Sequence, residues 1–179
     1  MRDEDLKDFS AFLKEFQSES DRGAALVGAA LIDHKLADTL RAFMVRGKVA
    51  DELIDGGTAP LGTFSARTKA TFALGLINRH EMNECTLIRK VRNEFAHRKH
   101  GTTFKDPVIS AFCHRLKSGL PGDRTDFVGK PRAIFVNAVV LTVLRLTYRD
   151  AWVARERRSS RFADATVLQQ MGAAVNPPR

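Results

Sequence analysis

The stretch TLIRKVRNEFAH, residues 86–97, predicts an amphipathic helix and is the clearest structural signal in the chain. Its apolar residues Leu87, Ile88, Val91 and Phe95 recur at a spacing of three and four residues. This spacing places side chains on one face of an α-helix. We therefore expect the helix to pack that face into a hydrophobic core.

The polar residues of the same helix form a row away from this apolar face. Arg89, Asn93 and His97 are spaced by four residues, and Arg92 lies on the flank of the row. One interpretation is a solvated surface, whose basic last turn suits the negative end of the helix dipole. The other is a binding site, because such a row can hold a phosphate or another anion. The residues alone leave both interpretations open.

Length and composition indicate one helical domain. A chain of 179 residues is long enough for a single domain with a substantial core. Only six prolines interrupt the long periodic runs, which favours helices throughout. We expect an all-α, single-domain helical bundle of about six helices over residues 1–158. Residues 159–179 are expected to form a loosely ordered tail.

Two long segments are apolar on most sides and are expected to be the buried central helices. They are residues 23–43, which begin with small and apolar residues, and residues 132–152. Further helices are expected at residues 3–16, from about 64 to 78, from about 83 to 99 and at 107–116. The Gly/Pro-containing segments 47–64 and 117–131 are expected to be loops.

Asp33 projects from the apolar face of the first central helix. An unpaired buried carboxylate is costly, so we expect Asp33 to pair with an arginine such as Arg67 or Arg89. A structural ion pair is favoured over a catalytic acid, and Asp33→Ala is then expected to cost about 3–5 kcal/mol. The other members expected in this structural polar network are Glu19, Asp21 and Arg22.

Charge is distributed unevenly along the chain. Residues 1–85 carry 11 Lys/Arg against 14 Asp/Glu, whereas residues 86–161 carry 17 against 6, a net charge of +11. A basic half is typical of proteins that bind nucleic acid. We expect Arg155, Arg157 and Arg158 to contribute to such binding as an electrostatic arm.

Several other classes of protein are disfavoured. The two cysteines, Cys85 and Cys113, have no CxxC spacing and are expected to be free thiols in a cytoplasmic protein. No dinucleotide fingerprint or HEXXH motif is present, so we expect neither a cofactor nor a metal. The acidic start lacks the apolar core of an export signal, and the apolar run at 23–32 is too short to cross a bilayer.

Three segments together resemble the mannitol operon repressor family of bacterial regulators. They are ESDRGAALVGAALID (residues 19–33), PLGTFSARTKATFALGLI (60–77) and IRKVRNEFAH (88–97). The resemblance covers roughly residues 5–155, and the order and spacing of the segments agree with the family. It implies an all-α transcription regulator without a standard helix-turn-helix. Such a regulator is expected to form a homodimer and to act through DNA or a regulatory protein partner.

A looser resemblance concerns only Arg92, Asn93 and His97, which are similar to the signature of HEPN domains. It implies a metal-independent ribonuclease or toxin, with His97 as general acid or base and Arg92 stabilising developing charge. In a straight helix Arg92 and His97 point about 140° apart. Such a site therefore requires a distorted helix or a second subunit. If the row is buried, we expect Arg92 to pair with Glu19 or Asp21.

A regulator is the favoured function, and whether the chain is an enzyme stays open. A protein-interaction adaptor without nucleic-acid contact is the remaining alternative.

Overall fold

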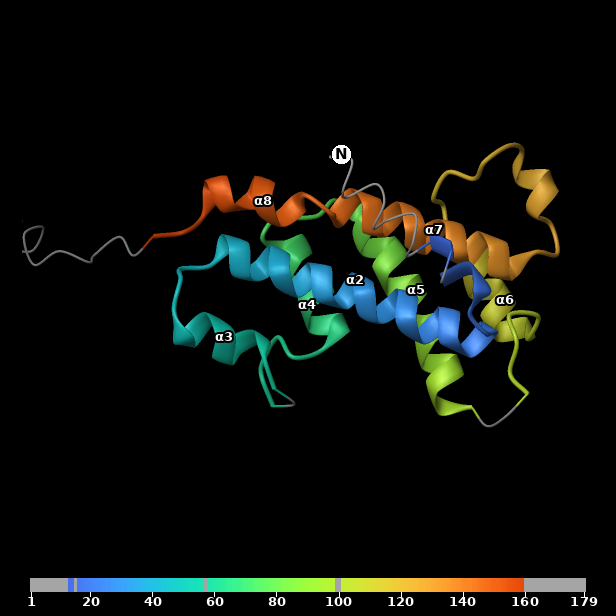
Figure 1. Ribbon diagram of the computed structural model, residues 1–179, viewed down its shortest axis with the longest axis horizontal. Coiled ribbons are helices and arrows are strands. Elements are labelled where there is room, and N and C mark those ends of the chain that lie inside the picture. The colour runs from blue at the N-terminus through green and yellow to red at the C-terminus, as the bar shows by residue number, and fades with distance from the viewer. Residues whose placement is uncertain (1–12, 15, 57, 99–100, 160–179) are drawn as a thin grey trace, which may run out of the picture.

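The computed structural model describes residues 13–14, 16–56, 58–98 and 101–159, and every regular element within them is a helix (Figure 1). The elements are α2 (Asp21–Phe43), α3 (Lys48–Ile54), α4 (Phe64–Ala73), α5 (Arg79–His97), α6 (Pro107–His114), the 3-10 helix η1 (Arg124–Phe127), α7 (Pro131–Leu146), α8 (Arg149–Val153) and the 3-10 helix η2 (Ala154–Glu156). The all-α prediction is confirmed. Most of the helix predicted at 3–16, and nearly all of the tail predicted at 159–179, lie outside the described residues.

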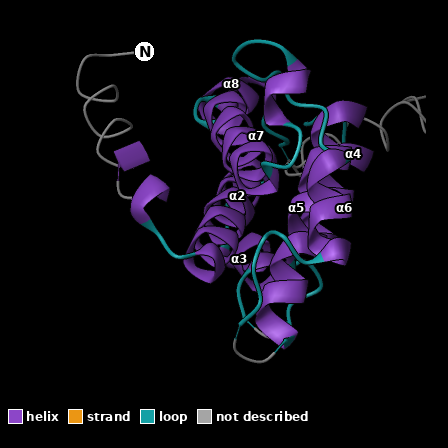
Figure 2. Ribbon diagram, turned by 90° about the vertical axis from the view of Figure 1, so that its right-hand side faces the viewer, coloured by secondary structure: helices purple, strands orange, loops and turns teal. Residues whose placement is uncertain are grey.

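The helices form two layers around a shared core. Figure 2 shows α2 and α7 on one side and α4, α5 and α6 on the other. The long helix α2 contacts α4, α5, α7 and α8, so it is the centre of the bundle. Its small residues allow this close packing. A Cβ atom at Gly28 would lie 2.9 Å from Val139 of α7, so a larger residue there would push the two helices apart.

Helix α5 presents the predicted apolar face to the core. Leu87, Ile88, Val91 and Phe95 are all buried. The helix begins at Arg79 rather than at about residue 83, so the predicted start was too late. The reason is a capping box, in which Asn78 accepts from the Glu81 N–H and the Glu81 side chain accepts from the Asn78 N–H.

An aromatic cluster joins the two layers. The ring of Phe104 lies 4.9 Å from that of Phe95 in α5 and 5.1 Å from that of Phe135 in α7. All three side chains are buried. Phe104 belongs to the connection between α5 and α6, which lies between the helices predicted to end at about 99 and to begin at 107. Offset and tilted aromatic pairs of this kind contribute beyond their buried area, so this connection is part of the core.

The region between α2 and α5 differs from the prediction in two ways. Residues 48–54 form helix α3 rather than a loop, and only Ile54 of this helix is buried, which explains its weak apolar pattern. Helix α4 ends at Ala73 rather than near Asn78, because Gly75 adopts a left-handed φ of +74°. Leu76 is buried, although it follows the helix instead of lying within it.

The second central helix is shorter than predicted. It ends at Leu146, and a turn at Thr147 and Tyr148 precedes α8, so Trp152 is 55% exposed rather than central. By length and composition, the run from Pro131 to Glu156 would pass as a membrane span. In this fold its apolar side chains pack against α2, α5 and α6, as those of a core helix do.

Candidate functional site

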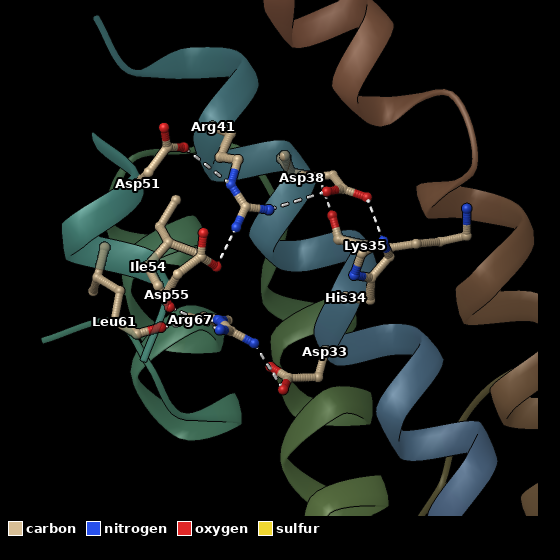
Figure 3. A network of polar contacts seen from close by, with 11 residues as sticks. Asp33, His34, Lys35, Asp38, Arg41, Asp51, Ile54, Asp55, Leu61 and Arg67 are labelled. Atoms are coloured by element: carbon tan, nitrogen blue, oxygen red, sulfur yellow. Dashed lines mark hydrogen bonds and ion pairs between the residues drawn. The ribbon is translucent and has the colours of Figure 1, made fainter. Parts of the chain in front are cut away.

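Asp33 and Arg67 form an ion pair that joins α2 to α4. The Arg67 Nη1 atom lies 2.9 Å from Asp33 Oδ2, and the two side chains are 13% and 23% exposed. Arg67 also donates to the carbonyl oxygens of Ile54 and Leu61, each over 2.9 Å (Figure 3). One guanidinium therefore fastens the end of α3 and the loop after it to α2. Asp33 is a structural residue of this network, and its pairing with Arg67 is one of the two expected.

Asp33→Ala is expected to lower the free energy of unfolding by about 1.5–3 kcal/mol, the usual contribution of a hydrogen bond to a charged group. This is less than the 3–5 kcal/mol estimated for an isolated buried arginine. The reason is that Arg67 keeps two carbonyl acceptors. Urea denaturation measures the effect, and Asp51→Ala is the control, because that carboxylate is 62% exposed. Equal stability of Asp33→Ala and wild type would refute the assignment.

A second arginine, Arg41, organises the neighbouring acidic surface. Its guanidinium contacts the carboxylates of Asp38, Asp51 and Asp55 (Figure 3). These carboxylates are between 39% and 62% exposed, so each contact is screened by solvent. The cluster holds α3 beside the last turns of α2 and has the character of a structural surface network.

Asp21 pairs with Arg132 of α7. The Asp21 carboxylate accepts from Arg132 Nη1 over 2.7 Å and from the Phe104 N–H over 3.0 Å. Arg132 also donates to the carbonyl oxygen of Glu19, and Arg22 donates to the carbonyl oxygen of Arg98. Among the described residues, Arg92 does not form the pair with Glu19 or Asp21 that was expected for a buried row, and the Asp21 carboxylate binds Arg132 instead.

Glu81 and Arg149 form an ion pair that was not predicted from the sequence. Arg149 Nη2 lies 2.7 Å from Glu81 Oε1, and the Glu81 side chain is only 3% exposed. Arg149 also donates to the carbonyl oxygen of Leu76 over 2.6 Å. The pair ties the start of α5 to α8. Glu81 lies between the two helices predicted at 64–78 and 83–99, so the sequence alone does not place it on a buried helix face.

The row Arg89, Asn93 and His97 lies on a regular part of α5 with Arg92 on its flank. Arg89, Arg92 and Asn93 are half-buried, and His97 is exposed. Among the described residues, none of these four side chains forms a hydrogen bond or ion pair. The helix continues without interruption from Arg79 to His97. Arg92 and His97 of one chain therefore point apart and do not meet at one site.

The basic residues after α8 differ in what they contact. Arg157 Nη1 donates to the carbonyl oxygens of Arg41 and Met44, over 3.2 and 3.1 Å, and so caps the C-terminal end of α2. The Arg158 N–H donates to the Phe43 carbonyl oxygen, and its guanidinium lies over the Phe43 ring. Arg155 is exposed. Arg157 was expected in a free electrostatic arm, but its guanidinium is engaged within the fold.

The two cysteines are buried in the core. Burial raises the pKa of Cys85 to about 12 and that of Cys113 to about 12. Both thiols therefore stay protonated and unreactive near neutral pH. Within the described ranges, no group of three His, Cys, Asp or Glu side chains is placed to hold a metal ion.

An apolar surface patch lies where α2 ends and α3 begins. Met44, Val45, Val49 and Leu53 line a pocket of about 380 Å³ there, and we name these four residues the α2–α3 patch. Val45 is 47% and Val49 is 70% exposed. Exposed apolar side chains that cluster in this way mark interaction surfaces.

Comparisons with known proteins agree with the resemblance seen in the sequence. A family model described as mannitol repressor matches residues 40–122, which run from the end of α2 through α6. The structure described as "X-ray structure of the MtlR-HPr complex from Escherichia coli" contains a chain similar in fold. The TM-score between the two chains is 0.52 and their sequence identity is 22%. The match covers 82% of this chain and 98% of the chain in that structure. A search of the curated proteins found no match.

Proposed function

Residues 40–122 match the mannitol repressor family model, and we propose that the chain is a member of that family, a regulator that acts by binding a protein partner. The observation that carries the proposal is the family match, joined to a fold shared with a chain solved in a complex with HPr. HPr is therefore the partner we propose for this chain. A homodimer is part of the same proposal.

The α2–α3 patch is the surface we assign to the partner. It lies inside the family-matched segment, and its exposed valines offer an apolar centre. Arg46, Lys48 and Glu52 are exposed beside it and supply a polar rim. An apolar centre within a polar rim is the usual anatomy of a protein–protein interface.

The test is isothermal titration of the purified chain with HPr of its own source organism and, separately, with HPr of Escherichia coli. We expect a saturable complex, and Val49→Asp is expected to weaken it about ten-fold or more, because a charge would enter the apolar centre. The matched control is Val128→Asp, since Val128 is 74% exposed and lies outside the matched segment.

Absence of a complex with both HPr proteins, or equal weakening by both variants, would contradict the proposal. Binding of duplex DNA is the alternative, favoured by the net charge of +11 over residues 86–161. In that case affinity falls with salt, with a log–log slope of about −0.9 per phosphate neutralised. Arg132, Arg149 and Arg157 would not contribute, since their guanidinium groups bind acceptors within the fold.

A further inference from the structure

A pocket of about 660 Å³ lies between α5 and the end of α6, away from the α2–α3 patch. Its volume is within the range of small-molecule sites, about 300–1,000 Å³. Lys90 and Asn83 line it from α5, and Arg115 and Lys117 line it from the segment that follows α6.

The charge of this pocket is predominantly positive. Lys90, Arg115 and Lys117 all face it, and none of them pairs with a carboxylate in the part of the chain that the structure describes. Lys90 instead lies over the Phe112 ring, with its Nζ atom 5.4 Å from the ring centroid. Three unpaired cations at one pocket favour an anionic ligand.

One carboxylate, that of Glu84, also borders the pocket, but it is used within the fold. Glu84 is 1% exposed and accepts from the Lys117 N–H over 3.0 Å and from the Ser118 N–H over 3.1 Å. The Ser118 hydroxyl donates to it as well. The carboxylate thereby holds the segment that carries Arg115 and Lys117 against α5. The pocket therefore has three cationic side chains and one carboxylate, and that carboxylate is already hydrogen-bonded within the fold.

The uncharged residues that line the pocket are polar except for Leu87. The Thr86 hydroxyl donates to the Met82 carbonyl oxygen and keeps its lone pairs for a donor. Asn83 is exposed and offers both a donor and an acceptor. His80 has a buried ring nitrogen, Nε2, without a hydrogen-bond partner among the described residues. These polar groups can contact hydroxyls, and Leu87 adds an apolar contact to the lining.

We propose that this pocket binds a small organic phosphate whose body carries hydroxyl groups. Lys90, Arg115 and Lys117 would hold the phosphate, and Asn83 and Thr86 would contact the hydroxyls. The volume leaves room for such a body beyond the phosphate itself. The pocket would give the regulator a small-molecule input separate from its protein-binding surface.

The test is isothermal titration of the full chain with glucose 6-phosphate, and with glucose as the uncharged control. We expect saturable binding of glucose 6-phosphate and none of glucose. Lys117→Gln and Arg115→Gln are each expected to weaken binding about ten-fold, the effect of losing one charge-assisted hydrogen bond. Lys69→Gln removes an exposed lysine of α4 outside the pocket and is expected to bind as wild type does.

Melting curves establish that each variant is folded, and Arg115 and Lys117 are both exposed, so their replacement leaves the core intact. Failure of the wild type to bind glucose 6-phosphate, or wild-type affinity in both pocket variants, would overturn the proposal. Val49→Asp is expected to retain glucose 6-phosphate binding. The ligand site and the protein partner are thus tested independently.

Discussion

Glu81→Ala is expected to lower the free energy of unfolding by about 2–5 kcal/mol, the combined cost of losing a hydrogen bond to a charged group and a helix cap. Within the described part of the chain, the substitution leaves the Arg149 guanidinium with the Leu76 carbonyl oxygen as its one partner. It also removes the side chain that accepts from the Asn78 N–H in the capping box of α5. Urea denaturation followed by circular dichroism measures the loss.

Two further variants separate this pair from an ordinary surface contact. Glu94→Ala breaks the exposed pair with Arg98 and is expected to cost at most about 1 kcal/mol. The double variant Glu81→Leu with Arg149→Met replaces both charges by apolar groups and is expected to recover much of the loss. Wild-type stability of Glu81→Ala would show that the pair contributes nothing to the fold.

Arg67→Ala is expected to cost about 3–5 kcal/mol, because Asp33 is then left without its cation. The carbonyl oxygens of Ile54 and Leu61 lose their donor at the same time. We expect amide hydrogen exchange to accelerate most in α3, since Arg67 holds the end of that helix. Denaturation and exchange together measure the global and the local effect.

Arg67→Lys is the informative comparison. Lysine keeps the charge, but it lacks the planar fork of donors with which Arg67 reaches three acceptors. We expect an intermediate loss of stability. Arg145→Ala removes an exposed arginine of α7 and is expected to change little. If Arg67→Ala and Arg145→Ala were equally stable, Arg67 would not be the centre of the network.

The buried face of α5 and the central position of α2 were predicted from the sequence, because the periodicity of apolar residues is a local property. The fold class followed from the same periodicity. Helix boundaries were less well predicted where a single local interaction decides them. Asn78 with Glu81 starts α5 early, and the φ of Gly75 ends α4 early.

The basic character of residues 86–161 was also visible in the sequence, but the sequence did not show which groups these basic side chains bind. Arg132 and Arg149 bind Asp21 and Glu81, which belong to the acidic first half of the chain. These ion pairs therefore join the acidic first half of the chain to the basic second half. A net charge calculated from composition does not show that these arginines form ion pairs, which only the tertiary structure reveals.

What the sequence determined by itself is therefore the all-α fold, the apolar face of α5 and the resemblance to one family. The tertiary structure decided which charged side chains form ion pairs within the fold and which line a pocket where they can bind a ligand. Glu81 and Arg149 are 68 positions apart in the sequence. Lys90 and Lys117 are likewise distant in the sequence, and both line one pocket. The spacing of apolar residues shows which face of a helix is buried. Side chains that are distant in the sequence are brought together only by the packing of whole helices.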